Sequence, residues 1–177
     1  MIEIILNDGK VTAVLARMAG RLEHPQPLFA QIGEALIDST KRRCATSTAP
    51  DGSRWAPNAQ STYLRNLGRY SKTTGKDGRL NAKGIGLAIT KKPLIGESGD
   101  LRRQFYSQVH ADGVTIGSSP RYARTQQFGA AQGAFGHTKR GGPIPWGTIP
   151  PRPFLGVSAQ DRVTIRDLVI QYLDPGA

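Results

Sequence analysis

Cysteine is almost absent from this chain of 177 residues, which contains only Cys44. A lone cysteine excludes a disulfide within the chain and a zinc site built from several thiolates. Cys44 falls at the end of a segment with helical periodicity, where we expect a packed thiol and not a nucleophile. The sequence therefore offers neither covalent cross-links nor evident thiol chemistry.

Long hydrophobic runs are also missing, and no stretch approaches the roughly 20 apolar residues that a membrane-spanning helix needs. Residues 1–6 lack the basic start of a signal peptide. We therefore expect no contact with a membrane, and synthesis and use in the cytoplasm.

Constellations for catalysis are not evident either. The three histidines, His24, His110 and His137, are scattered and have no metal-ligand spacing. The sequence has no phosphate-binding Gly-Lys-Ser/Thr loop and no Gly-x-Ser-x-Gly elbow. Gly84-Ile85-Gly86 lacks the third glycine of a dinucleotide-binding loop. We expect no enzymatic activity, no cofactor and no metal.

A metal-assisted nuclease is the one enzymatic alternative that the acidic residues leave open. Asp51, Glu97 and Asp100 would form a metal site only if the fold gathered them. Asp51 already has a simpler role in a turn, as does Asp112.

Negative charge is scarce, because 13 acidic residues face 24 lysines and arginines, which gives a formal net charge of +11. The excess is concentrated in residues 65–92, where Asp77 is the one acid. Such a span is typical of contact with polyanions, either DNA or acidic protein surfaces. The candidate contacts are Arg69, Lys72, Lys76, Arg79 and Lys83.

A nucleic-acid-binding protein is therefore the alternative reading of this chain. Tyr70 is the one aromatic residue in the basic segment 65–92, so base stacking would be poor. No segment carries a recognisable helix for reading bases. Contact with DNA through this segment would be unspecific.

Hydrophobic spacing predicts the regular elements. Residues 2–6 alternate as in a short strand, and residues 11–22 and 28–44 have helical spacing. Asp112-Gly113 between alternating segments predicts a tight hairpin. A short helix over 122–128, ended by Gly129, precedes a last helix that begins at Ser158 with Asp161 as its capping partner.

The remaining stretches are expected to be loops. Residues 45–64 contain the turn-forming Pro50-Asp51-Gly52 and then Trp55, which we expect to cover the edge of the core, with an interface anchor as the alternative. Residues 66–84 have no periodicity, and 87–90 read as a possible strand. The 130–148 stretch reads as a glycine-rich loop.

Two phrases stand on either side of that loop. The first, Tyr122 to Gly129, reads YARTQQFG, and the second, residues 149–158, reads IPPRPFLGVS. Three prolines fix the backbone and remove three donors around Arg152. This pattern favours a rigid, extended docking segment in which Phe154 and Leu155 are buried anchors and Arg152 bonds at or near a boundary with a neighbouring subunit. We therefore expect Arg152→Ala to spare the fold of the single subunit and to weaken assembly.

These phrases resemble the family of phage virion morphogenesis or tail completion proteins, best known from Mu-like phages. Three further stretches are similar to that family in the same order: APDGSRWAP from Ala49, LIGESGDLR from Leu94 and VTIGS from Val114. Ser98 stands where the family usually has threonine.

The resemblance implies a structural virion protein that joins head to tail or completes the tail, as a neck or tail-terminator ring subunit. It implies a cyclic homo-oligomer, with six copies by precedent at tail ends, and partners among connector and tail-tube proteins. Channel DNA is a further possible contact. The expected interface residues are Trp55, Tyr122, Gln126, Phe128, Arg152, Phe154 and Leu155.

The predicted fold is α+β, in one domain. An antiparallel sheet packs against the long helix and the C-terminal helix, and extended basic loops or arms at 65–92 and 130–148 leave the core. Residues 1–24 form an N-terminal strand and helix.

Overall fold

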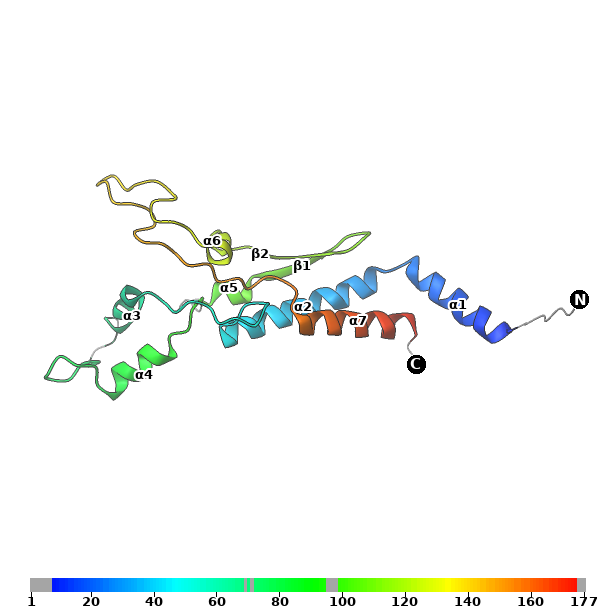
Figure 1. Ribbon diagram of the computed structural model, residues 1–177, viewed down its shortest axis with the longest axis horizontal. Coiled ribbons are helices and arrows are strands. Elements are labelled where there is room, and N and C mark those ends of the chain that lie inside the picture. The colour runs from blue at the N-terminus through cyan, green and yellow to red at the C-terminus, as the bar shows by residue number, and fades with distance from the viewer. Residues whose placement is uncertain (1–7, 69, 71, 95–98, 175–177) are drawn as a thin grey trace, which may run out of the picture. The chain divides into compact units, whose positions relative to one another are not determined.

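A computed structural model describes residues 8–68, 70, 72–94 and 99–174 of the chain (Figure 1). Helices dominate, and one two-stranded hairpin is the sheet of this part of the chain, so the fold class is α+β as predicted. The elements in chain order are α1 (Gly9–Leu22), α2 (Gln26–Thr46), α3 (Gln60–Leu67), α4 (Ala82–Thr90), α5 (Asp100–Arg103), β1 (Phe105–Val109), β2 (Val114–Ser118), α6 (Ala123–Phe128) and α7 (Ala159–Leu173).

The chain divides into two compact units, each made from separated segments. The first consists of the described residues of Met1–Ser39, Tyr106–Gly117 and Val157–Ala177. The second consists of the described residues of Thr40–Phe105 and Ser118–Gly156. Whether they form the single domain expected from the chain length stays a prediction.

In the first unit, α1 and α7 are in contact near their C-terminal ends. The guanidinium of Arg21 lies 5.9 Å from the centre of the Tyr172 ring, and the Tyr172 hydroxyl donates to the carbonyl of His24 at 2.6 Å. Arg17 and Asp174 form an ion pair of 3.1 Å. These contacts are polar and at least partly exposed, and no residue of α1 is buried.

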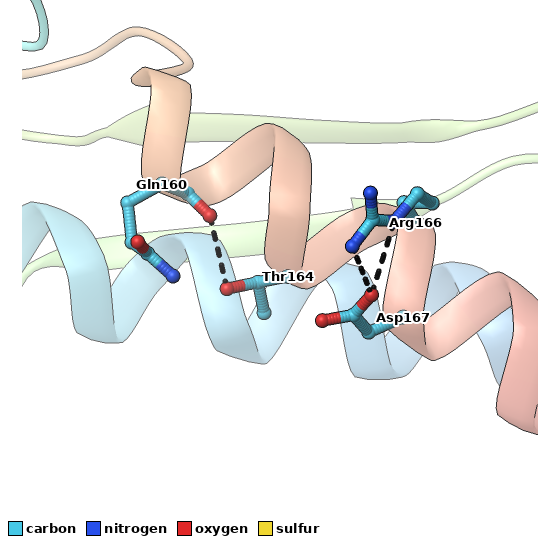
Figure 2. Close-up of polar contacts among 4 residues, drawn as sticks. All are labelled: Gln160, Thr164, Arg166 and Asp167. Atoms are coloured by element: carbon cyan, nitrogen blue, oxygen red, sulfur yellow. Dashed lines mark hydrogen bonds and ion pairs between the residues drawn. The ribbon is translucent and has the colours of Figure 1, made fainter.

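Helix α7 begins as the sequence predicts. The hydroxyl of Ser158 accepts from the Asp161 amide, and the Asp161 carboxylate accepts from the Ser158 amide, which is a complete capping box. Figure 2 shows two further contacts on this helix. Thr164 donates to the carbonyl of Gln160 at 3.1 Å, while Arg166 and Asp167 form an exposed ion pair of 2.9 Å that contributes little stability.

Helix α2 packs on the hairpin at Gly33. A Cβ atom at this position would lie 2.9 Å from Cβ of Ser107 and 3.1 Å from a methyl carbon of Val114. The helix can approach the strands this closely because glycine has no side chain. The predicted packing of a sheet on the long helix is therefore present at this point. The predicted turn also forms, since the His110 amide donates to the Gly113 carbonyl at 2.8 Å.

The second unit contains a compact apolar core. Its buried members come from α2, the following loop, α5, α6 and the segment before α7. They are Cys44, Ala49, Trp55, Leu101, Ala123 and Phe154, with Leu94, Phe105 and Leu155 packed against them. Trp55 is buried, as expected for a residue that covers core surface.

Two local predictions are wrong. Residues 87–90, read as a possible strand, belong to α4. That helix begins after Asn81, whose side chain caps it by accepting from the Gly84 amide at 3.0 Å. Gly84 also lets α4 lie close to the backbone of Thr73, since a Cβ at this position would lie 2.2 Å from the Thr73 carbonyl oxygen. The predicted loop 45–64 is shorter than expected, because α3 begins at Gln60 and contacts α4.

The predicted strand at 2–6 lies outside the described residues, and so do Arg69 and Glu97. Within the described part of the chain, no helix combines the length and apolar character that crossing a bilayer requires.

We expect the Cys44 thiol to be shielded in the folded protein. Its side chain is buried, and burial raises its pKa to about 11 against the opposing effect of Arg43 and Arg102. The thiol is therefore protonated at neutral pH, and the thiolate is the reactive form. An aromatic disulfide reagent at pH 7.5 should label the native protein far more slowly than the same protein in guanidinium chloride. Equal rates would contradict this packing.

Candidate docking site at the proline segment

The proline segment, residues 149–155, is held in place by one glutamine side chain from α6. The side-chain oxygen of Gln127 accepts hydrogen bonds from the amides of Phe154 at 2.9 Å and Leu155 at 3.1 Å. Its side-chain nitrogen donates to the Leu155 carbonyl at 3.0 Å. One amide side chain thus pairs three backbone groups, which uses both lone pairs of its oxygen.

The other backbone amides of the segment also donate hydrogen bonds. The Arg152 amide donates to the carbonyl of Gln126 at 2.8 Å, and the Ile149 amide donates to the carbonyl of Ala130 at 2.8 Å. Prolines have no amide donor, so the three prolines of the segment add none. Every backbone N–H of residues 149–155 therefore has a partner, which allows the segment to lie against the core without an unsatisfied donor.

Arg152 is buried and points its guanidinium at backbone carbonyls of the loop after Trp55. Its Nε donates to Ala56 O at 2.9 Å, and one terminal nitrogen donates to Pro57 O at 2.8 Å. The other lies 3.4 Å from the side-chain oxygen of Gln126. The planar guanidinium can bridge these acceptors because its donors are fixed in a fork.

The electrostatic environment of Arg152 is unusual for an arginine. Burial lowers the pKa of its guanidinium, while Tyr63 raises it to a smaller extent. The oxygens that accept from it are neutral carbonyl and amide groups. An arginine stays protonated in proteins, so a positive charge is held here by dipoles.

The segment places a single aromatic ring in the core. Phe154 is fully buried, and its ring centre lies 5.7 Å from that of Phe105 at an interplanar angle of 38°. The indole N–H of Trp55 donates to the Pro153 carbonyl at 2.7 Å. Phe154 is thus buried as predicted, whereas Leu155 is half-buried.

Gly129 ends α6 and turns the chain into the 130–148 loop. Its φ of +75° favours glycine, and a Cβ there would lie 2.7 Å from Ile149 O. Ala130 then pairs with Ile149 as an antiparallel bridge. The two phrases identified in the sequence are therefore joined at the base of the loop that separates them.

The remaining expected interface residues lie on α6 or directly before it, and each has some exposed surface. Tyr122 is 46% exposed and Phe128 is 73% exposed, while Gln126 is half-buried. Tyr122 and Gln126 line a cavity that also borders Arg152. The docking roles of these residues stay a prediction.

The structure describes four of the five residues that were expected to contact polyanions. Lys72, Lys76, Arg79 and Lys83 are all exposed. The first three lie on or beside a small hairpin closed by a bridge between Thr74 and Leu80. The basic segment 65–92 is therefore not a structureless arm, because it contains this hairpin and α4.

Other groups that could carry chemistry are dispersed. Among the described residues, His, Cys, Asp and Glu side chains nowhere form a group of three that could hold a metal. Asp51 accepts from the amide and hydroxyl of Ser53 at 2.9 and 2.7 Å, and these bonds lower the pKa of its carboxyl. Asp51 thus has the turn role that the sequence suggests.

Sequence reasoning missed Gln127 and the intramolecular role of Arg152. The pair Gln126-Gln127 was visible in the first phrase, but only Gln126 was singled out. The expectation that Arg152→Ala would spare the fold of the subunit is revised, because the side chain is buried and bonded within its own chain.

Removing the side-chain amide of Gln127 should destabilise the subunit. In Gln127→Ala the amides of Phe154 and Leu155 lose their acceptor, so we expect a loss of about 1–3 kcal/mol in the free energy of unfolding. Gln108→Ala, at an exposed position, is the matched control and should be near neutral. Denaturant titration measures both, and equal midpoints would refute the holding role.

Loss of the Arg152 guanidinium should also lower the free energy of unfolding. Arg152→Ala leaves the carbonyls of Ala56 and Pro57 without this donor, and we expect a cost of about 1–3 kcal/mol. Arg152→Lys should recover only part, because an ammonium cannot reproduce the planar fork. A wild-type unfolding midpoint for Arg152→Ala would instead favour a role confined to an interface.

Truncating the buried ring of Phe154 should be more damaging. Phe154→Ala should cost about 3–5 kcal/mol, since the ring is fully buried and its cavity can close only partly. Phe128→Ala removes the same ring from a position 73% exposed and should change stability little. Comparable losses in thermal unfolding for the two variants would contradict the described core.

Comparison with known proteins agrees with the resemblance noted in the sequence. The chain is 28% identical over 163 residues to tail completion protein S of Escherichia phage P2, an alignment covering 89% of this chain and 93% of that protein. No solved structure matches the chain. Residues 6–174 match the phage virion morphogenesis family, and the chain belongs to that family.

Proposed function

We propose that this chain is a structural subunit that completes the phage tail and joins it to the head, as part of a neck or tail-terminator ring. The observation that carries the proposal is the similarity to tail completion protein S, which extends over nearly the whole of both chains. A match of that extent covers the scaffold and the two phrases together, and not a shared fragment.

The surface of the second unit supports a role in assembly. Phe128, Phe135 and Trp146 are 73%, 57% and 78% exposed, and all three lie in or beside the 130–148 loop. Large exposed aromatic side chains grouped on one segment are typical of surfaces that are covered by a partner. Phe154 fills the core of the same unit, so the subunit can present these aromatic side chains without losing its own packing.

The proposed assembly is a cyclic homo-oligomer. A ring requires a heterologous interface, in which two different surfaces of each copy meet and the rotation closes. Six copies is the number that precedent at tail ends suggests. The proposed location is the head-proximal end of the tail in the virion, reached by assembly in the host cytoplasm, with connector and tail-tube proteins as neighbours.

A second candidate function is unspecific contact with DNA through the basic segment 65–92. Exposed Lys72, Lys76 and Arg79 on and beside the 74–80 hairpin support it. Asp77 is the acid among them, and it accepts from the Arg79 amide at 3.1 Å. The two functions are compatible, because a ring at the neck surrounds the channel through which the genome passes.

The purified protein should associate with itself. Native mass spectrometry and light scattering across a hundredfold range of concentration should find one closed oligomer, with its share rising with concentration. Addition of tail-tube protein should increase that share. A monomer at all concentrations, with and without tail-tube protein, would contradict the ring.

DNA binding should be dependent on salt and free of cleavage. Neutralising Lys72, Lys76 and Arg79 to glutamine should weaken binding and lower the slope of log affinity against log salt by about 2–3. The matched control neutralises Arg102, Arg103 and Arg124, which are exposed elsewhere in the same unit. Plasmid incubated with Mg²⁺ or Mn²⁺ should stay intact. Cleavage lost in Asp100→Asn would instead support a nuclease.

A further inference from the structure

A cavity of about 400 Å³ opens beside the proline segment in the second unit. Leu94, Leu101 and Ile149 contribute apolar surface to it, and Leu101 also belongs to the core. The size is within the range of pockets that bury small ligands or single large side chains. The cavity is therefore a concave, partly apolar site on the subunit surface.

Cationic and aromatic groups also line this cavity. Lys91, Lys92 and Tyr122 contribute to its wall, and the Lys92 ammonium donates to the Ala45 carbonyl at 2.7 Å. This hydrogen bond fixes the position of the Lys92 side chain at the wall of the cavity. An aromatic face is a suitable neighbour for such a charge because its π system carries a negative quadrupole.

The 130–148 loop presents the complementary group. Trp146 has the highest exposed fraction, 78%, among the large apolar side chains that the structure describes. Its backbone is fixed, because the Gln132 side chain donates to the Trp146 carbonyl at 3.0 Å and the Gly133 amide donates to the neighbouring Pro145 carbonyl at 3.1 Å. The indole is thus displayed on a hydrogen-bonded frame, which lowers the entropy lost when it is buried.

We propose that Trp146 of one copy inserts into this cavity of the next copy and forms the repeating contact of the ring. The inference rests on the proposed ring function and names the two surfaces that meet in it. The indole supplies apolar area for the leucines and an aromatic face for the lysines. Its N–H is a donor that can pair with the side-chain oxygen of Asn58, which also lines the cavity.

The occupant is a second copy because each chain carries one of each surface. Trp146 does not fill a cavity of its own chain, since its side chain is 78% exposed there. A two-fold dimer in which each copy inserts Trp146 into the other would use both surfaces, and a wild-type protein that stops at such a dimer would overturn the ring contact. Without that reciprocity the contact is heterologous and leaves one indole and one cavity free at the ends of an open chain. Closure of that chain into a ring satisfies all of them.

Two variants separate the surfaces. Trp146→Ala removes the inserted group and keeps the cavity, whereas Ala59→Trp places a bulky side chain at an exposed position that lines the cavity and keeps Trp146. Each variant alone should need at least about tenfold more protein to associate. Trp146→Phe should recover part of the association, and Tyr70→Ala removes an exposed aromatic outside the loop as a matched control.

Mixing the two variants gives the sharpest readout. Trp146 of the Ala59→Trp copy can enter the open cavity of the Trp146→Ala copy, and the resulting pair has no further matching surfaces. Native mass spectrometry of the mixture should therefore show a one-to-one dimer and no larger species. Circular dichroism and thermal unfolding establish that both variants are folded.

The outcomes distinguish this contact from the ring itself. A wild-type ring that persists in Trp146→Ala overturns the contact and leaves the ring standing, as does a mixture that forms no dimer. A wild-type protein that stays monomeric, with and without tail-tube protein, overturns both. Protection of Trp146 emission from acrylamide on association, measured as the difference between wild type and Trp146→Phe, supports the contact.

Discussion

The side-chain amide of Gln127 is the interaction on which the rest of the second unit depends. Residues 150–155 contain three prolines, which interrupt any helix or strand ladder, so the remaining donors of these residues need partners from elsewhere. Gln127 supplies an acceptor to the amides of Phe154 and Leu155 and pairs the Leu155 carbonyl. Because the backbone is satisfied in this way, the ring of Phe154 can be fully buried, and the indole of Trp55 finds its acceptor at Pro153.

This arrangement separates, within the two phrases, the buried groups that stabilise the subunit from the accessible groups. The buried groups, Phe154 and the Arg152 guanidinium, are bonded inside the subunit. The accessible aromatic groups lie on α6 and on the loop that begins at the bridge between Ala130 and Ile149. The proline segment therefore acts as the rigid base of a loop, and the contact proposed above uses the exposed part of that loop and the cavity beside the segment.

The sequence predicted the elements that local signals define. Helical spacing identified α1 and α2, the Asp112-Gly113 turn identified the hairpin, and Ser158 with Asp161 identified the start of α7. The sequence did not reveal α4, because residues 66–84 lack periodicity and residues 87–90 read as a possible strand. The close approach of Gly84 to the Thr73 carbonyl is a tertiary contact that the sequence does not show. It assigned Arg152 to an interface, since charge in a rigid segment suggests docking, and neighbouring carbonyls from residues almost a hundred positions away could not be seen. Gln127 was missed for the same reason.

Amide hydrogen exchange at Phe154 and Leu155 in the unassembled subunit tests this account most directly. If Gln127 holds these amides within the subunit, both should be protected to the level of global unfolding before any partner is present, and assembly should add protection mainly in the 130–148 loop. Rapid exchange of both amides in the free subunit, with protection only after assembly, would contradict the account and return the proline segment to the interface.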